Sequence, residues 1–359
     1  MKKIIIVFFV FLLFSAGGFF FYNFYNRIFL ENSSQPNFLS PVATPTPFPT
    51  LQFSVWIPWW DEKKSLESLK VTSSKLKYIS PVWYKIDNSG ELREIKVTKK
   101  NEVVKIASES GILLIPTIGN DFDGNRISKL LSSAELNQLL IKKMILIAKE
   151  NKFLGWDLDW EEIKESDRNS FSEFVRILST ALHQENLKLI VTVHAQTGKI
   201  DDWIGSKGQD WDSLSKNADA LRIMAYDFHH SGSSAGPVTP INKLKEVLDY
   251  AISVIPLEKL VVGLPNYGYD WKGNRGEPIQ YEKAIALLLN NNGSWLRDKD
   301  SFALRGVYID SFGSKHELWF EDKESIIKKI LIAKEYGIYQ YCFWSLGGED
   351  KTFWESLSL

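Results

Sequence analysis

The chain has 359 residues, of which 44% are hydrophobic, and a formal net charge of −1 from 43 basic and 44 acidic side chains. This length is enough to bury a large core. The near-neutral charge, with no basic stripe or nucleic-acid motif, argues against nucleic acid as a partner. The single cysteine, Cys342, excludes an intrachain disulfide, so export of this chain would not bring a disulfide framework with it.

The N-terminus has the pattern of a membrane anchor or an export signal. Lys2 and Lys3 precede an uncharged, mainly apolar run over 4–22. As a helix this run would be roughly 28 Å long, close to the thickness of a hydrocarbon core. Lysines before it and aromatic residues after it predict an uncleaved anchor with the rest of the chain outside the membrane. A cleaved signal peptide, and hence secretion, is the alternative for residues 1–31, although no small-x-small cleavage site follows the run.

A linker is predicted over residues 32–51, which carry no charged side chain and are rich in Pro, Ser and Thr. Prolines at such close spacing exclude a helix or a central strand, so this segment reads as a semi-stiff tether. The tether would hold an extracytoplasmic domain, residues 52–359, away from the membrane.

The domain over 52–359 alternates between strand-like and helix-like patterns eight times. Apolar runs predict buried strands at 53–58, 77–84, 112–118, 153–160, 187–194, 219–226, 259–265 and 338–345. Between them, helices are predicted near 62–75, 98–110, 128–151, 168–186, 205–217, 239–255 and 323–336. Strands that alternate with helices pair in parallel, and eight such units favour a closed (β/α)8 TIM barrel of the α/β class over an open doubly wound sheet.

The stretch from 272 to 322 is too long for one connection between a strand and a helix. It contains a helical pattern near 280–290 and two strand-like runs at 302–309 and 317–320. We therefore expect a small α+β insertion after the seventh strand, placed where it can form one wall of a cleft.

The fourth predicted strand carries three acidic side chains at every second position. Asp157, Asp159 and Glu161 alternate with large apolar residues, so the acids share one face of the strand and the apolar groups share the other. Carboxylates at this spacing repel one another, which raises at least one pKa and keeps a proton available for general acid catalysis. The alternative is a polar edge strand whose acids are merely solvated.

Further candidates follow other strands at the same end of the barrel, where the active sites of such barrels lie. Met224 and Tyr226 share a face at the end of the sixth strand, and Asp227 comes next. The others are Trp59, Trp60, Trp83 and Tyr84 from the first two strands, Asn266 and Tyr267 from the seventh, and Trp344 from the eighth. Sugar rings stack on flat aromatic faces, so this combination predicts a saccharide cleft. His194, at the end of the fifth strand, either lines that cleft or has a structural role.

These motifs resemble glycoside hydrolase family 18. The family signature Asp-x-x-Asp-x-Asp-x-Glu is matched by LGWDLDWE at 154–161, the Met-x-Tyr-Asp pattern by MAYD at 224–227, and the eighth-strand tryptophan by Trp344. The runs GPVTPI at 236–241, GLPNYGYDW at 263–271 and LWFED at 318–322 are most similar to the bacterial branch with spore-cortex and peptidoglycan N-acetylglucosaminidases.

The resemblance implies a substrate-assisted retaining mechanism. Glu161 would be the general acid and base, Asp159 would orient the substrate's N-acetyl group, Asp157 would share a proton behind Asp159, and Tyr226 would hydrogen-bond the N-acetyl carbonyl. The implied substrate-binding residues are Trp344, Met224, Asp227, Tyr267, Trp59 and Asn266. No metal or cofactor is expected, and the protein is expected to be a monomer.

The chain departs from the family signature at Leu154, where the first Asp would stand. The loss of that acid removes a polar partner of Asp157, which predicts altered pKa coupling rather than inactivity. The alternative hypothesis is a saccharide-binding barrel without hydrolytic activity. Peptidoglycan, chitin and N-linked glycans all carry the N-acetyl group that the mechanism needs.

Overall fold

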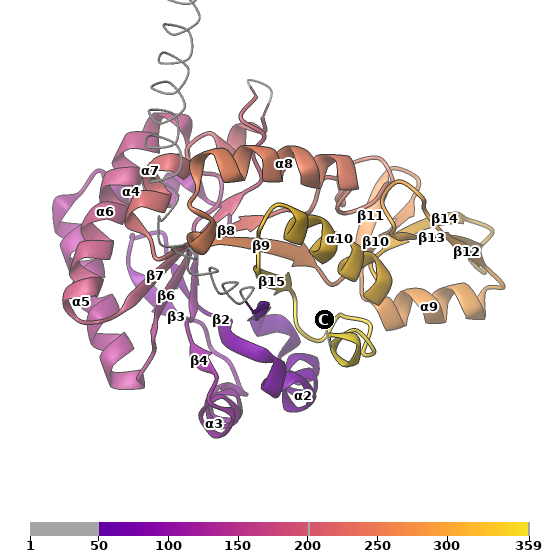
Figure 1. The fold of residues 1–359 in the computed structure, drawn as a ribbon, viewed down its shortest axis with the longest axis horizontal. Helices are drawn as coiled ribbons and strands as arrows, with labels where there is room; N and C mark the ends of the chain where they lie inside the picture. Colours follow the sequence, from indigo (N-terminus) through magenta and orange to yellow (C-terminus); the bar gives the residue numbers. More distant parts are fainter. Residues whose placement is uncertain (1–49, 200–201, 358–359) are drawn as a thin grey trace, which may run out of the picture. The chain divides into compact units, whose positions relative to one another are not determined.

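The computed structural model describes residues 50–199 and 202–357, which contain a closed barrel of parallel strands (Figure 1). The strands are β1 (Gln52–Ile57), β2 (Leu76–Ile86), β4 (Leu113–Leu114) with β5 (Thr117–Gly119), β6 (Gly155–Asp159), β7 (Lys188–His194), β8 (Ala220–Met224), β9 (Leu260–Pro265) and β15 (Gln340–Trp344). They follow the order β1-β15-β9-β8-β7-β6-β5-β2, and pairing of β1 with β2 closes the ring. The predicted (β/α)8 architecture is therefore confirmed, with β4 and β5 sharing the third position.

Helices surround these strands on the outside of the barrel (Figure 1). They are α2 (Glu62–Thr72), α3 (Lys100–Ser110), α4 (Gly124–Leu131), α5 (Ala134–Asn151), α6 (Arg168–Gln184), α7 (Trp211–Asn217), α8 (Ile241–Val254) and α10 (Lys323–Glu335). The single helix predicted over 128–151 is wrong, because α4 ends and α5 begins within it. The Ser133 hydroxyl accepts a hydrogen bond from the Leu136 backbone N–H, which caps a new helix at this point.

Two apolar layers follow from the alternation of side chains along the strands. One layer lies inside the ring and contains Trp56, Tyr78, Ile115, Ile190, Ala220, Val261 and Cys342, all buried. The other lies between the ring and the helices, and Val55 and Ile57 on either side of Trp56 belong to it. A side chain's position in this alternation thus decides whether it faces the barrel interior or the helices.

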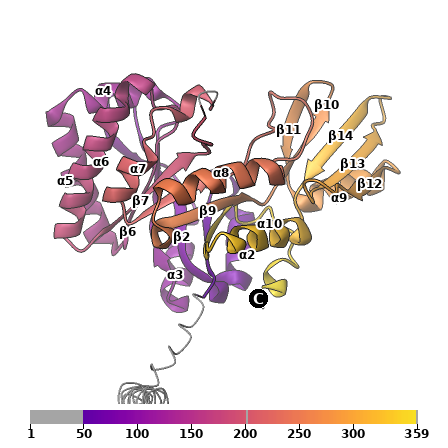
Figure 2. The same cartoon turned by 45° about the horizontal axis from the view of Figure 1, so that its top comes forward.

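An inserted lobe follows β9 and stands beside the barrel (Figure 2). It consists of an antiparallel sheet with the order β11-β10-β14-β13-β12 and one helix, α9 (Tyr281–Asn290). The strands are β10 (Gly268–Lys272), β11 (Arg275–Ile279), β12 (Ser294–Arg297), β13 (Leu304–Ile309) and β14 (Lys315–Phe320). The insertion starts at Gly268 rather than at residue 272, and β10, β11 and β12 were not predicted.

The two faces of the inserted sheet have different neighbours. One face packs on α9 through buried residues that include Leu288 and Phe320. The other forms a cluster with Val238 from the loop after β8, in which Trp271 and Trp319 are buried and Tyr226 takes part. The insertion therefore supports the segment that carries Tyr226 at the rim of the barrel.

The predicted anchor, and the predicted linker up to residue 49, lie outside the described residues. Within residues 50–199 and 202–357, no helix combines the length and apolar character needed to cross a membrane.

Candidate active site

The acidic residues of β6 point toward the inside of the barrel, whereas their apolar neighbours point outward. Asp157 is completely buried, and Trp156 and Leu158 belong to the layer between strands and helices. Trp160 continues that outer layer and stacks on Phe174, with 5.1 Å between the ring centroids. The edge-strand alternative is thus excluded, because β6 pairs with β5 on one side and β7 on the other.

Asp157 is held by four donors from four different strands. Its Oδ2 atom accepts hydrogen bonds from Trp56 Nε1 at 2.9 Å, Thr117 Oγ1 at 2.7 Å and Arg222 Nη1 at 2.8 Å. Its Oδ1 atom accepts one from Thr192 Oγ1 at 2.7 Å. Both oxygens of the buried carboxylate are therefore occupied, and the Arg222 guanidinium balances the negative charge.

Arg222 replaces the polar partner that the sequence had led us to regard as lost at Leu154. Leu154 packs against the apolar cluster inside the ring, whereas the completely buried Arg222 supplies the polar contact to Asp157. Burial alone would lower the pKa of Arg222, but the adjacent Asp157 raises it above its ordinary value. Arg222 was not among the predicted site residues, although it lies in the same inward file as Met224 and Tyr226.

Asp159 and Glu161 follow Asp157 toward the open end of the barrel, and both favour the protonated form. Burial raises the pKa of Asp159 to about 8, the charge of Asp157 adds to this effect, and Arg222 opposes it. Burial also raises the pKa of Glu161 well above its ordinary value, with smaller contributions from Asp159 and Asp227. Repulsion between the carboxylates, the cause expected from their spacing, is thus second to desolvation in raising these two pKa values.

The backbone around Glu161 is clamped by neutral amide side chains. Asn120 Nδ2 donates to the Glu161 carbonyl at 2.8 Å, and Asn120 Oδ1 accepts from the Glu161 N–H at 3.0 Å. Gln209 Nε2 donates to the Trp160 carbonyl at 3.0 Å. His194 stands beside the carboxyl group itself, with 3.4 Å between its Nε2 atom and Glu161 Oε2. These contacts restrict the position of Glu161 from both neighbouring strands.

Tyr226 and Asp227 come from the segment after β8. The Tyr226 hydroxyl has its pKa raised well above the ordinary value, first by burial and then by Asp159, Asp227 and Glu161, so these groups share one region. Gly263 on β9 allows close approach of β8 and the Tyr226 ring, because a Cβ atom there would lie 2.6 Å from the Ile223 carbonyl oxygen and 3.3 Å from Tyr226 Cε1.

Asp227 is held by two tyrosines, Tyr267 just before the insertion and Tyr269 within it. Its Oδ1 atom accepts hydrogen bonds from the hydroxyls of Tyr267 at 2.5 Å and Tyr269 at 3.0 Å. Burial raises the pKa of Asp227, while these hydrogen bonds act in the opposite direction. Tyr269 belongs to β10, so the inserted sheet holds one acidic group of the site directly.

Trp344 ends β15, which lies opposite β6 in the ring. Its ring centroid is 5.7 Å from that of Trp56 and 5.9 Å from that of Trp60. Trp59 and Trp60 meet edge to face, and they are 46% and 60% exposed. The aromatic surface that begins at Trp344 therefore continues outward to solvent through Trp60.

Two other predicted substrate-binding residues are buried. Met224 is buried at the end of β8, and Asn266, after β9, is only 1% exposed. The Asn266 backbone N–H donates to the Trp344 carbonyl at 2.7 Å, whereas its side-chain amide makes no hydrogen bond within the described part of the chain. Asn266 thus stands next to Trp344 with both polar atoms of its side chain unused.

Trp83 and Tyr84 do not reach the site, and their prediction as rim residues is wrong. Both are buried in the outer layer, where Tyr84 contacts Trp156 edge to face with 5.0 Å between centroids. The register of β2 against β5 shifts between Val82 and Tyr84, which disrupts the simple alternation of faces. Beyond this irregularity β2 continues and pairs with β3 (Leu92–Glu94).

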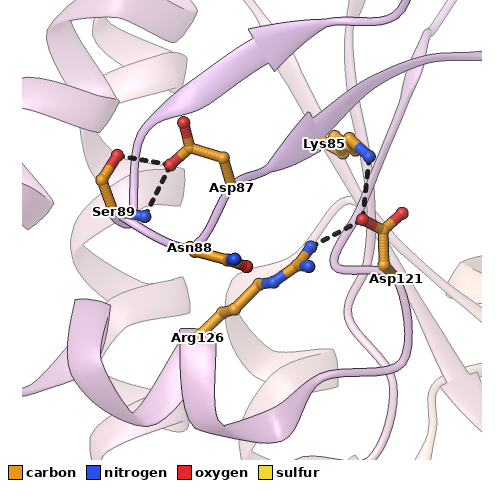
Figure 3. Close-up of a pocket in the computed structure, with 6 residues that line it drawn as sticks. All are labelled: Lys85, Asp87, Asn88, Ser89, Asp121 and Arg126. Carbon is orange, nitrogen blue, oxygen red and sulfur yellow. Dashed lines mark hydrogen bonds and ion pairs between the residues drawn. The ribbon is translucent and has the colours of Figure 1, made fainter.

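A polar hollow of about 450 Å³ lies at the ends of β2 and β5. Its lining is formed by Lys85, Asp87, Asn88, Ser89, Asp121 and Arg126 (Figure 3). Lys85 and Arg126 both form ion pairs with Asp121, at 2.9 and 2.6 Å. Arg126 also reaches the carbonyl of Asn120 at 3.4 Å, so this charged cluster supports the residue that clamps Glu161.

Comparison with known proteins shows which family this chain is similar to. The sequence profile of Glycosyl hydrolases family 18 matches residues 55–349. The uncharacterized glycosylase YvbX of Bacillus subtilis (strain 168) is 29% identical over 242 residues, which are 66% of this chain and 70% of that protein. The cortical fragment-lytic enzyme of Bacillus anthracis is 28% identical over 292 residues, covering 79% and 67% of the two chains.

The crystal structure of a chitinase from Chromobacterium violaceum ATCC 12472 superimposes with a TM-score of 0.79 at 25% identity. The superposition covers 85% of this chain and 97% of that one. The barrel, the acidic file at the end of β6 and the profile match over most of the domain agree with one another. The chain belongs to glycosyl hydrolase family 18 and is a glycoside hydrolase.

Proposed function

We propose that this enzyme hydrolyses β-1,4-linked glycans that contain N-acetylglucosamine, by a substrate-assisted retaining mechanism with Glu161 as general acid and base. The observation that carries the proposal is the pair of acids at the end of β6, Asp159 and Glu161, whose pKa values are both raised. They lie near Tyr226 and across the barrel from Trp344. A protonated acid, a second acid beside it and an aromatic floor suit the cleavage of a sugar that supplies its own nucleophile.

In the first step, protonated Glu161 transfers its proton to the glycosidic oxygen as the bond to the anomeric carbon breaks. The carbonyl oxygen of the substrate's N-acetyl group attacks that carbon and forms an oxazolinium ion. Asp159 orients the N-acetyl group and stabilises the positive charge, and Tyr226 donates a hydrogen bond to the carbonyl oxygen. In the second step, the Glu161 carboxylate takes a proton from water, whose oxygen opens the oxazolinium ring with net retention of configuration.

Asp157 would hold the alternative position for the shared proton behind Asp159, so that Asp159 can become a carboxylate beside the oxazolinium ion. The two oxygens of Asp157 accept four hydrogen bonds, one of them from the Arg222 guanidinium, and the charge of Asp157 helps to raise the pKa of Asp159. Trp344 would form the floor under the reacting sugar, and Asp227 would stand beside Tyr226. Met224, Asn266, Tyr267 and Trp59 would complete the sugar-binding surface.

Peptidoglycan, chitin and N-linked glycans are the candidate substrates. The cortical fragment-lytic enzyme among the relatives favours peptidoglycan, and the structural likeness to a chitinase favours chitin. The predicted membrane anchor would place the domain next to the cell's own envelope, which also favours peptidoglycan.

Incubation of the protein with peptidoglycan, chitin oligomers and an N-glycosylated protein in parallel, followed by mass spectrometry of the products, tests the proposal. We expect fragments with N-acetylglucosamine at the new reducing end from at least one substrate, with the β configuration retained. Tight binding of all glycans without any product would instead favour a saccharide-binding protein that lacks hydrolytic activity.

The raised pKa of Asp159 predicts that Asp159→Asn is more stable than wild type at pH 8 but not near pH 4. Between the ordinary pKa of an aspartate and about 8, the folded protein keeps a proton that the unfolded chain has released. The stability of wild type therefore falls as pH rises through this window, and an amide removes this dependence. We expect a gain of at least about 1 kcal/mol at pH 8 in urea unfolding.

Asp219→Asn is the matched control, because it should change the stability at pH 8 in the opposite direction. Burial raises the pKa of Asp219, but hydrogen bonds from Lys188, His183 and the Leu189 backbone, with the charge of His183, together lower it below its ordinary value. Its carboxylate thus stabilises the folded protein at pH 8 and loses this effect in acid. If both variants changed stability in the same direction at pH 8, the environment described for Asp159 would be wrong.

A further inference from the structure

His194 contacts the carboxyl group of Glu161, the proposed acid of the reaction. Neighbours that do not touch Glu161 directly hold His194 in place. Its backbone N–H donates to Gln209 Oε1 at 2.8 Å. Its ring meets the ring of Trp203 edge to face, with 4.6 Å between the centroids. The imidazole therefore has little freedom to move, and its Nε2 atom lies 3.4 Å from Glu161 Oε2, so a shorter contact requires movement of the Glu161 carboxyl group.

The Nε2 atom is a buried nitrogen without a conventional hydrogen-bond partner in residues 50–199 and 202–357. A buried polar atom without a hydrogen-bond partner lowers the stability of the fold, so its presence suggests that a partner becomes available during function. Glu161 Oε2 is the acceptor in reach, and its 3.4 Å separation is a long contact that can shorten when substrate fills the site.

The charged groups that act on the Glu161 carboxyl are all acidic, and the Tyr226 hydroxyl lies in the same region. Asp159 precedes it on the same file, Asp227 faces it from the segment after β8, and Glu162 follows it in the chain, and all three raise its pKa. Burial lowers the pKa of His194 to about 4, so the ring is neutral at pH 7 and carries one N–H. His194 thus brings a hydrogen-bond donor into an acidic environment without adding a competing positive charge.

We propose that His194 is a positioning residue, which donates a hydrogen bond from Nε2–H to Oε2 of Glu161 during the reaction. This inference rests on the function proposed above for Glu161. With Oε2 engaged as an acceptor, the acidic proton stays on Oε1 and is available to the glycosidic oxygen. After the proton has been transferred, the same donor stabilises the carboxylate. The opposite tautomer would accept the proton of Glu161 and draw it away from the substrate.

Two substitutions separate hydrogen-bond donation from packing. His194→Phe keeps an aromatic ring against Trp203 but removes the donor, whereas His194→Gln places an N–H near the position of Nε2 and removes the ring. We expect His194→Phe to lower kcat about tenfold or more with KM nearly unchanged, because the variant loses one hydrogen bond to a carboxylate in the reaction. His194→Gln should recover most of kcat. His183→Phe is the control, because His183 lies on α6 and pairs with Asp219 far from the acidic file.

A titration of the Glu161 carboxyl by carbon-13 NMR tests the contact without relying on turnover, with Glu161→Gln used to assign the resonance. The donor stabilises the carboxylate, so we expect the pKa of Glu161 to rise in His194→Phe and to return toward the wild-type value in His194→Gln. Identical titrations in wild type and His194→Phe, or a Gln variant no closer to wild type than the Phe variant, would overturn the inference. Absence of any turnover by wild type would count against the proposed function and leave the NMR result to decide the role of His194.

Discussion

Glu161→Gln is expected to lower kcat by about 10²–10⁴-fold while the protein continues to bind its glycan. An amide cannot transfer a proton to the glycosidic oxygen, and the loss of one general acid has an effect of this size. Gln has nearly the same shape, so the clamp from Asn120 on the Glu161 backbone would remain in place. Product formation from chitin oligomers and from peptidoglycan, measured by chromatography, gives kcat, and isothermal titration gives the affinity.

Glu165→Gln serves as the matched control for this substitution. It is the same change of an acid to an amide only a few residues further along, on an exposed side chain of the short helix Glu165–Asp167. We expect its kcat to stay within about twofold of wild type, because exposed side chains outside a site contribute little. Wild-type turnover by Glu161→Gln would remove the acid assignment, whatever the control showed.

Arg222→Leu is expected to destabilise the folded protein by about 3–5 kcal/mol, the largest stability change that we predict. The substitution leaves the Asp157 carboxylate without its counter-ion at a position where both side chains are completely buried. The three neutral donors to Asp157 would remain, but they do not balance its charge. Urea unfolding at pH 7, followed by tryptophan fluorescence, measures the change.

An exposed ion pair provides the comparison for Arg222. Arg176 and Glu173 on α6 are joined at 2.6 Å with both side chains more than half exposed, so Arg176→Leu should cost no more than about 0.5 kcal/mol. The double substitution Arg222→Leu with Asp157→Leu should recover much of the stability, because it removes the unpaired charge, but it should not restore activity. Equal losses in Arg222→Leu and Arg176→Leu would contradict the buried ion pair.

The sequence alone determined the architecture and the strand that carries the acids. Buried parallel strands are continuous apolar runs, so their number and order could be read from the chain, and eight units separated by helices lead to a closed ring. The file of Asp157, Asp159 and Glu161 could also be predicted, because the period of two along a strand is a local property. The insertion was recognisable from its length, yet its first strand was missed, since Gly268–Lys272 follows β9 too closely to form a separate run.

Only the tertiary structure decided which side chains meet in the site. Arg222 and Asp157 are 65 residues apart in sequence, and His194 approaches Glu161 from the neighbouring strand, so no local pattern joins either pair. Trp83 and Tyr84 lie in the outer layer and not at the rim, because a shift of register on β2 disrupts the simple alternation of side chains between the two faces of the strand. Desolvation, the main cause of the raised pKa values of Asp159 and Glu161, depends on how completely the surrounding strands and loops exclude water. That exclusion is a property of the assembled barrel, and it could not be deduced from the spacing of the acids along one strand.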